Sequence, residues 1–210
     1  MSSLWHAVTR STADVIDRVR AKAVSTARYL RRIDMVCSDG KITRLDAEQA
    51  YRGAFLSFHS HVENTIEYLF IGLLRGRVNH RLGSVRALVS IPSDAVATRV
   101  VFGGRRYADW LPYNQHTYDR SKLYFASGKP FTLLDKPARR ALDDLTVLRN
   151  ALAHESSQAI RRFREEFTNG KALPPDQRRP AGYLRGFHAV GQTRFEFLMA
   201  QTAQNLESLR

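Results

Sequence analysis

Apolar side chains recur every three or four residues along most of this chain, which is the spacing of one face of an α-helix. The pattern is densest over residues 46–75, where one side carries Phe55, Phe58, Val62, Ile66, Leu69 and Leu73. A second apolar side of the same segment is formed by Ile66, Phe70 and Leu74. Because a helix with two apolar sides has to be covered by other helices, the sequence predicts a central helix inside a bundle.

The same spacing predicts further helices over residues 11–37, 113–126, 136–154, 156–167 and 188–209. Asp46 is expected to cap the central helix, because an aspartate side chain accepts hydrogen bonds from the free backbone N–H groups of the first turn. Asp135 is expected to cap the 136–154 helix, and Pro137 suits its first turn. These elements predict an all-α fold, a helical bundle.

Glycines and prolines interrupt the helical spacing over residues 76–112. Residues 98–102 and 107–111 are rich in residue types that favour strands, and they flank the glycine- and arginine-containing residues 103–106. This pattern predicts a small β-hairpin within an insertion in the bundle.

Length and composition limit the class of protein. With 210 residues, 43% of them hydrophobic and 25% charged, we expect one folded domain over 1–210 with a helical N-terminal extension over 1–40. The longest apolar run, residues 68–74, is far shorter than the ~20 residues of a membrane-spanning helix, and residues 2–20 lack the apolar core of a signal peptide. A single cysteine excludes an internal disulfide and a multi-cysteine zinc site. These features predict a cytoplasmic protein.

The net charge of +13 arises from 33 Lys and Arg against 20 Asp and Glu, and all but six of the basic residues are arginine. Arginine forms paired hydrogen bonds to phosphate and stacks on bases. A genome rich in arginine codons would explain the excess of Arg over Lys, but it would not explain the net charge. We therefore expect a polyanion partner, with nucleic acid favoured over a membrane surface.

The segment 142–156 places polar groups opposite a core stripe. At 100° per residue, one side of this helix carries Leu142, Leu145, Leu148 and Leu152. His154 and Asn150 fall on the opposite side, and Arg149 falls at the edge of the stripe. The apolar Val147 and Ala151 flank His154, so this face is expected to be a contact surface, such as one for another chain.

Arg149, Asn150 and His154 together supply what RNA cleavage needs. A neutral histidine can take the proton of a 2′-hydroxyl near pH 7, and a guanidinium stabilises charge on the phosphate oxygens. The asparagine amide can orient either group, and no metal or cofactor is required. Two alternatives stay open: a solvated helix end whose Arg and His complement the helix dipole, and attack by water in place of the 2′-hydroxyl.

Other patterns do not support a cofactor or metal site. Gly103 and Gly104 precede no Gly-Lys-Ser/Thr, so they are not a phosphate-binding loop. His59 and His61 are two residues apart and point about 200° apart on a helix, so they cannot hold one ion. We expect no metal and no cofactor.

Three further groups are weaker candidates. Glu63 follows His59 by one helical turn on the central helix and is a candidate to orient Arg149 or His154. Arg105 and Arg106, beside two aromatic residues, suit single-stranded RNA, although a solvated turn over a tryptophan anchored in the core fits equally. The other RNA-binding candidates on the chain, which an ordinary solvated helix face would also explain, are Arg161 and Arg162.

The run from Arg149 to His154 fits the R-x(4–6)-H motif of the HEPN superfamily, with the polar residue that commonly follows the arginine. The leucine-rich helix around it and the long helix over 55–74, with Glu63 inside, also resemble HEPN bundles. The resemblance extends over 46–210 and is closest to stand-alone ribonucleases of the RiboL-PSP and MAE groups, which occur among bacterial toxins and phage-defence genes.

The resemblance implies a metal-independent endoribonuclease in which Arg149, Asn150 and His154 act on RNA. It also implies a homodimer whose two motif helices meet in one cleft, restrained by an antitoxin or sensor protein. The insertion over 76–112 departs from the smallest HEPN bundles. Because some HEPN domains lack catalysis, the alternative is an arginine-rich adaptor that binds RNA or protein.

Overall fold

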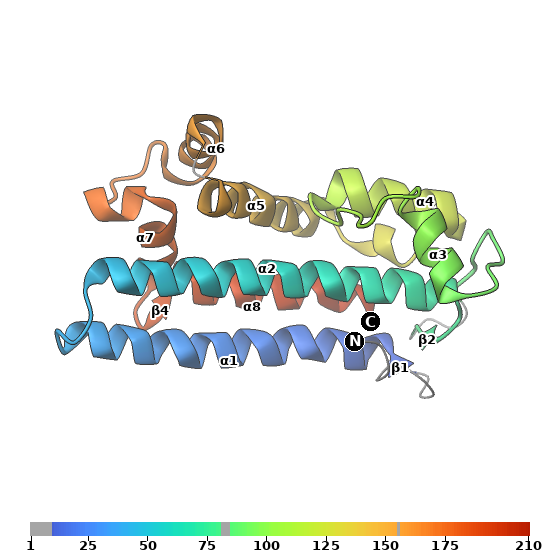
Figure 1. Ribbon diagram of the computed structural model, residues 1–210, viewed down its shortest axis with the longest axis horizontal. Coiled ribbons are helices and arrows are strands. Elements are labelled where there is room, and N and C mark those ends of the chain that lie inside the picture. Colours follow the sequence, from blue (N-terminus) through green and yellow to red (C-terminus); the bar gives the residue numbers. More distant parts are fainter. Residues whose placement is uncertain (1–9, 81–84, 155) are drawn as a thin grey trace.

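The structure, a computed structural model, describes residues 10–80, 85–154 and 156–210. Its α-helices are α1 (Thr12–Ser38), α2 (Arg44–Leu74), α3 (Asp94–Val101), α4 (Asp119–Tyr124), α5 (Lys136–Ala153), α6 (Ser157–Phe163), α7 (Pro180–Arg185) and α8 (Arg194–Leu206) (Figure 1). Helical turns of the π type, Asn114–Tyr118 and Arg164–Thr168, adjoin α4 and α6. Single 3₁₀ turns cover Ala126–Gly128, Phe131–Leu133, Pro175–Arg178 and Glu207–Leu209.

The strands are short: β1 (Arg10–Ser11) pairs in parallel with β2 (Val78–Asn79), and β3 (Phe187–Ala189) pairs antiparallel with β4 (Gln192–Thr193). A mostly helical fold with one small antiparallel hairpin confirms the expected fold class. In the part of the chain that the structure describes, no helix is both long and apolar enough to cross a membrane. The first nine residues of the expected N-terminal extension lie outside the described residues.

Four helices, α1, α2, α5 and α8, form the body of the molecule. The helices α2 and α8 each contact both α1 and α5, and α1 and α5 lie on opposite sides of α2 (Figure 1). The N-terminal segment that we expected to be an extension therefore supplies one of the four bundle helices.

Side-chain caps fix where the bundle helices begin. At α2 the cap is Thr43 and not Asp46, as we expected: the Thr43 hydroxyl accepts from the Asp46 N–H at 3.2 Å, and the Asp46 carboxylate accepts from the Thr43 N–H at 2.9 Å. This reciprocal pair starts the helix earlier than a single aspartate cap would. At α5 the prediction is confirmed, because Asp135 accepts from the Ala138 N–H at 2.8 Å and Pro137 lies in the first turn.

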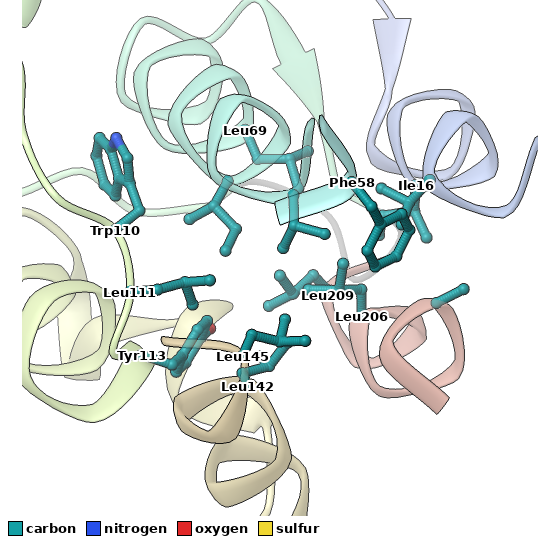
Figure 2. Close-up of a cluster of buried hydrophobic side chains, with 14 of the residues drawn as sticks. Ile16, Phe58, Leu69, Trp110, Leu111, Tyr113, Leu142, Leu145, Leu206 and Leu209 are labelled. Atoms are coloured by element: carbon teal, nitrogen blue, oxygen red, sulfur yellow. The ribbon is translucent and has the colours of Figure 1, made fainter. Parts of the chain in front are cut away.

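The core of the bundle forms where these helices meet (Figure 2). Phe58 and Leu69 from α2 point toward Leu145 on α5 and Leu206 on α8, and Ile16 from α1 closes the cluster. The predicted core stripe of α5 is confirmed, because the structure buries Leu142, Leu145, Leu148 and Leu152.

The hairpin that we expected over residues 98–111 is wrong in position. Residues 98–101 belong to α3, because the Ser93 hydroxyl accepts from the Val96 N–H and so starts a helix through this β-branched run. Gly103 and Gly104 then adopt φ values of 61° and 76°, which end the helix in the left-handed region that glycine tolerates best. Residues 107–111 run as irregular chain.

The hairpin occurs instead at β3 and β4, within residues that we expected to be the start of the last helix. Gly191, with φ 75°, makes the turn beside the fully exposed Val190. Thr193 caps α8, and the Glu196 carboxylate accepts from the Thr193 N–H at 3.1 Å. This capping box delays the start of the helix to Arg194.

A cluster of aromatic rings fastens the middle of the chain to α2. Phe70 is fully buried, and its ring lies 5.0 Å from the rings of Trp110, Phe125 and Phe131. These three partners come from the chain between α3 and α5. Their packing on α2 therefore holds the inserted segments against the bundle.

We expect Phe70→Ala to lower the free energy of unfolding by about 3–5 kcal/mol, because it removes a buried ring and leaves a cavity. The matched control is Phe187→Ala on β3, where the side chain is 67% exposed; this change should cost no more than about 0.5 kcal/mol. Urea unfolding followed by circular dichroism measures both. Equal losses in the two variants would show that the aromatic cluster does not hold the fold.

Candidate functional site

The candidate site lies where α5 ends and the chain turns into α6. His154 caps the end of α5, with its backbone N–H donating to the Asn150 carbonyl at 3.1 Å. Ser156 starts α6 by accepting from the Ala159 N–H at 3.2 Å. Because the turn is this short, α6 packs against α5, as Figure 1 shows. His154 is exposed at this corner, while Arg149 and Asn150 are half-buried.

The structure brings the three predicted residues of the motif into direct contact. The Arg149 Nη1 group donates to Asn150 Oδ1 at 3.0 Å and lies 2.6 Å from His154 Nε2. A guanidinium carries only donors, so Nε2 of His154 accepts this bond. The contact therefore requires a neutral imidazole with its proton on Nδ1, a tautomer inferred from the bonding. An unprotonated Nε2 is the form that a general base needs.

A cavity of about 310 Å³ opens beside this contact. Its lining comes from both helices and the turn between them: Val147, Asn150, His154, Ser156, Gln158, Ala159 and Arg162. Val147 and Ala151 are only 5% and 1% exposed. The expectation that these two residues form an open contact surface is therefore wrong, because the chain itself buries them.

Behind Arg149, the helix α2 contributes a buried histidine. His59 is 5% exposed, and its Nδ1 lies 3.4 Å from Glu63 Oε2. Burial and, to a smaller extent, the positive charge of Arg149 lower the pKa of His59 to about 4. His59 Nε2 is buried without a hydrogen-bond partner among the residues that the structure describes. Sequence reasoning gave His59 no role, although its position one turn before Glu63 was a usable signal.

Glu63 lies near the site but is bonded elsewhere. Its Oε1 accepts from the backbone N–H groups of Trp110 and Leu111, both at 3.3 Å. Burial raises the pKa of Glu63, while these two bonds and the charge of Arg149 lower it. Across the described residues no hydrogen bond or ion pair joins Glu63 to Arg149 or His154, so its evident contacts hold the chain around Trp110 on α2.

Arg105 and Arg106 do not join the motif residues. They are exposed on the chain that follows α3, and Figure 1 shows α3 and α6 toward opposite ends of the molecule. Trp110 is 1% exposed, donates to Glu67 at 2.9 Å and lies under the Arg120 guanidinium. It is anchored in the core and cannot stack on a base, whereas Tyr107, the other aromatic residue beside the two arginines, is 72% exposed; RNA binding by Arg105 and Arg106 stays a prediction.

The two arginines of α6 differ. Arg162 lines the cavity beside His154 and has no ion pair within the described ranges. Arg161 does not line it, and its Nε lies 3.9 Å from Glu165. No cluster of three or more His, Cys, Asp or Glu side chains arranged to hold a metal ion occurs in the described part of the chain.

We expect acid to destabilise the fold through His59. The pKa of this group is 6.5 in the unfolded chain and about 4 in the folded protein, so the unfolded chain binds the proton first. The free energy of unfolding therefore decreases as pH falls through this window, by about 3 kcal/mol at most. His59→Phe should flatten the pH dependence of urea unfolding between pH 7 and 4.5. The same change at His188, exposed on β3, controls for the loss of an imidazole; a wild-type slope in His59→Phe would contradict the prediction.

Comparison of the chain with protein-family models, curated proteins and solved structures found no match. The roles of Arg149, Asn150 and His154 therefore rest on the contacts of this chain and on the resemblance of its motif.

Proposed function

We propose that this protein is a HEPN-type endoribonuclease whose active residues are Arg149, Asn150 and His154. The observation that carries the proposal is the 2.6 Å contact of Arg149 with His154 Nε2 at the edge of an open cavity. An arginine for phosphate and a neutral histidine for a proton lie side by side, as cleavage of an RNA strand requires. The net charge of +13 favours a polyanionic substrate.

In the proposed reaction, the phosphate of the RNA replaces His154 as the partner of the Arg149 guanidinium. His154 Nε2 is then free to take the proton of the neighbouring 2′-hydroxyl. The 2′-oxygen attacks phosphorus, the bond from phosphorus to the 5′-oxygen breaks, and that oxygen leaves with a proton returned by the imidazolium or by water. The products are a 2′,3′-cyclic phosphate and a 5′-hydroxyl. Asn150 holds the guanidinium through its Oδ1.

The biological setting that we propose follows the same resemblance. The enzyme would act in the cytoplasm as a toxin or phage-defence effector, restrained by an antitoxin or sensor protein until it is needed. A homodimer is part of this proposal, and its support is the resemblance alone, since the chain buries Val147 and Ala151 by itself. Sedimentation at micromolar concentration tests it, and a strictly monomeric species would contradict it.

Incubation of the purified protein with RNA in EDTA, followed by end-group analysis, tests the activity. We expect cleavage without added metal, leaving cyclic phosphate ends. His154→Ala should reduce the rate by about 10²- to 10⁴-fold, the usual contribution of a positioned acid–base group. Its folding should be unchanged, because the His154 side chain is exposed. Arg149→Ala should also abolish cleavage and, being half-buried, should cost some stability.

His188→Ala is the matched control, since His188 is an exposed histidine on β3 outside the site. Wild-type cleavage by folded His154→Ala protein would end the proposal, as would cleavage that depends wholly on added divalent metal. Fragments with a 5′-phosphate would show that water attacks in place of the 2′-hydroxyl. RNA binding without cleavage, weakened by salt and by loss of scattered arginines, would support the adaptor instead.

A further inference from the structure

The cavity beside His154 has the size and lining of a site for one nucleotide. Its volume of about 310 Å³ lies at the lower limit for pockets that bind small organic ligands, about 300–1,000 Å³. Ala159 is half-buried and contributes apolar surface that can cover part of the face of a base, while Val147 is only 5% exposed. The other lining residues are polar or charged, so the rim can contact the edge of a base and its phosphate.

Several polar groups of this cavity are free to bind a ligand. Neither the Gln158 amide nor the Arg162 guanidinium has a hydrogen-bond partner among the residues that the structure describes. The Asn150 carbonyl oxygen accepts from Arg149, which leaves its NH₂ group to donate. Among the described lining residues the free groups are therefore mostly donors, and the Gln158 carbonyl oxygen is an acceptor beside them.

A donor-rich cavity selects for bases that present acceptors. Guanine O6 and uracil O4 are carbonyl oxygens on the pairing edge, whereas adenine and cytosine carry an amino group at the corresponding position. An arginine pairs well with the O6 and N7 atoms of guanine. In single-stranded RNA such edges are exposed and can be read by side chains. An amino group placed against Arg162 and the Asn150 amide would instead meet donors.

We propose that this cavity binds the base of the nucleotide whose 2′-hydroxyl is deprotonated by His154, and that Gln158 and Arg162 select guanine or uracil there. The inference rests on the proposed function for the placement of the ribose. His154 itself lines the cavity, so a base held by Gln158 brings its own ribose to the imidazole. The enzyme would then cut single-stranded RNA after a guanine or uracil.

The test uses short single-stranded RNAs that differ only in the base before the cut. Cleavage is measured on the RNAs themselves, and binding is measured by fluorescence anisotropy on versions with a 2′-deoxynucleotide at that position, which cannot be cut through the 2′-oxygen. We expect wild-type protein to prefer guanine and uracil over adenine and cytosine by about tenfold in both assays, the usual size of one good base contact.

Substitutions in α6 show which of its side chains select the base. Arg162→Ala should remove most of the preference for guanine and uracil, because the donors of the guanidinium are lost. Gln158→Glu should shift it toward cytosine and adenine, because a carboxylate accepts from their amino groups. Arg161→Ala is the matched control, since Arg161 lies on the same helix without lining the cavity; it should keep the wild-type order of bases.

The outcomes separate this inference from the proposed function. Equal cleavage and binding of all four RNAs by the wild-type protein would overturn the base site, as would a preference unchanged in both Gln158→Glu and Arg162→Ala. Cleavage without base preference would support the proposed ribonuclease and contradict the base site. If Gln158→Glu changes the base preference in binding but no RNA is cleaved, the result would support the base site and contradict the ribonuclease.

Discussion

The burial of α2 is the constraint on which the rest of the structure depends. This helix carries apolar side chains on two sides, and those that are fully buried include Phe55, Phe58, Val62, Ile66, Leu69 and Phe70. A single partner helix cannot cover both sides. The helices α1 and α5 do so from opposite sides, and Phe70 adds the aromatic contacts that hold the inserted chain. The position of α5, and with it the candidate site at its end, follows from this requirement.

The bundle explains why the motif residues are accessible. The leucine stripe fixes the rotation of α5 about its own axis, because Leu145 and Leu148 must face α2 and α8. Once that rotation is set, Arg149 is directed toward the edge of α2 near His59, and His154 reaches the end of the helix where the chain turns. The end of α5 is therefore both rigidly held and open to solvent, which is the combination that a positioned catalytic group requires.

Periodicity in the sequence was enough to predict the long helices α1, α2 and α5 and the motif, because these depend on residues close together in the chain, whereas α3 and α7 were not predicted. The core stripe of α5 and the Asp135 cap are examples. The hairpin was misplaced because residues 98–102 have strand-type composition, while the Ser93 cap starts a helix through them. The cavity could not be predicted, because it depends on how α6 turns back after His154. For the same reason nothing in the sequence indicated Gln158, and His59 was suggested only as half of a rejected metal pair and as the neighbour of Glu63.

The surroundings of Arg149 distinguish it from the arginines that pair with carboxylates. Arg140 pairs with Asp144 and Glu166, as many other arginines pair with carboxylates. Arg149 bonds only neutral groups among the described residues, the Asn150 carbonyl and the His154 imidazole. Burial keeps His59, which lies near Arg149, neutral, and Glu63 accepts hydrogen bonds from backbone N–H groups. Among the described residues the positive charge thus has no direct counter-ion beside the open cavity, and a phosphate would supply one without displacing an ion pair that they form.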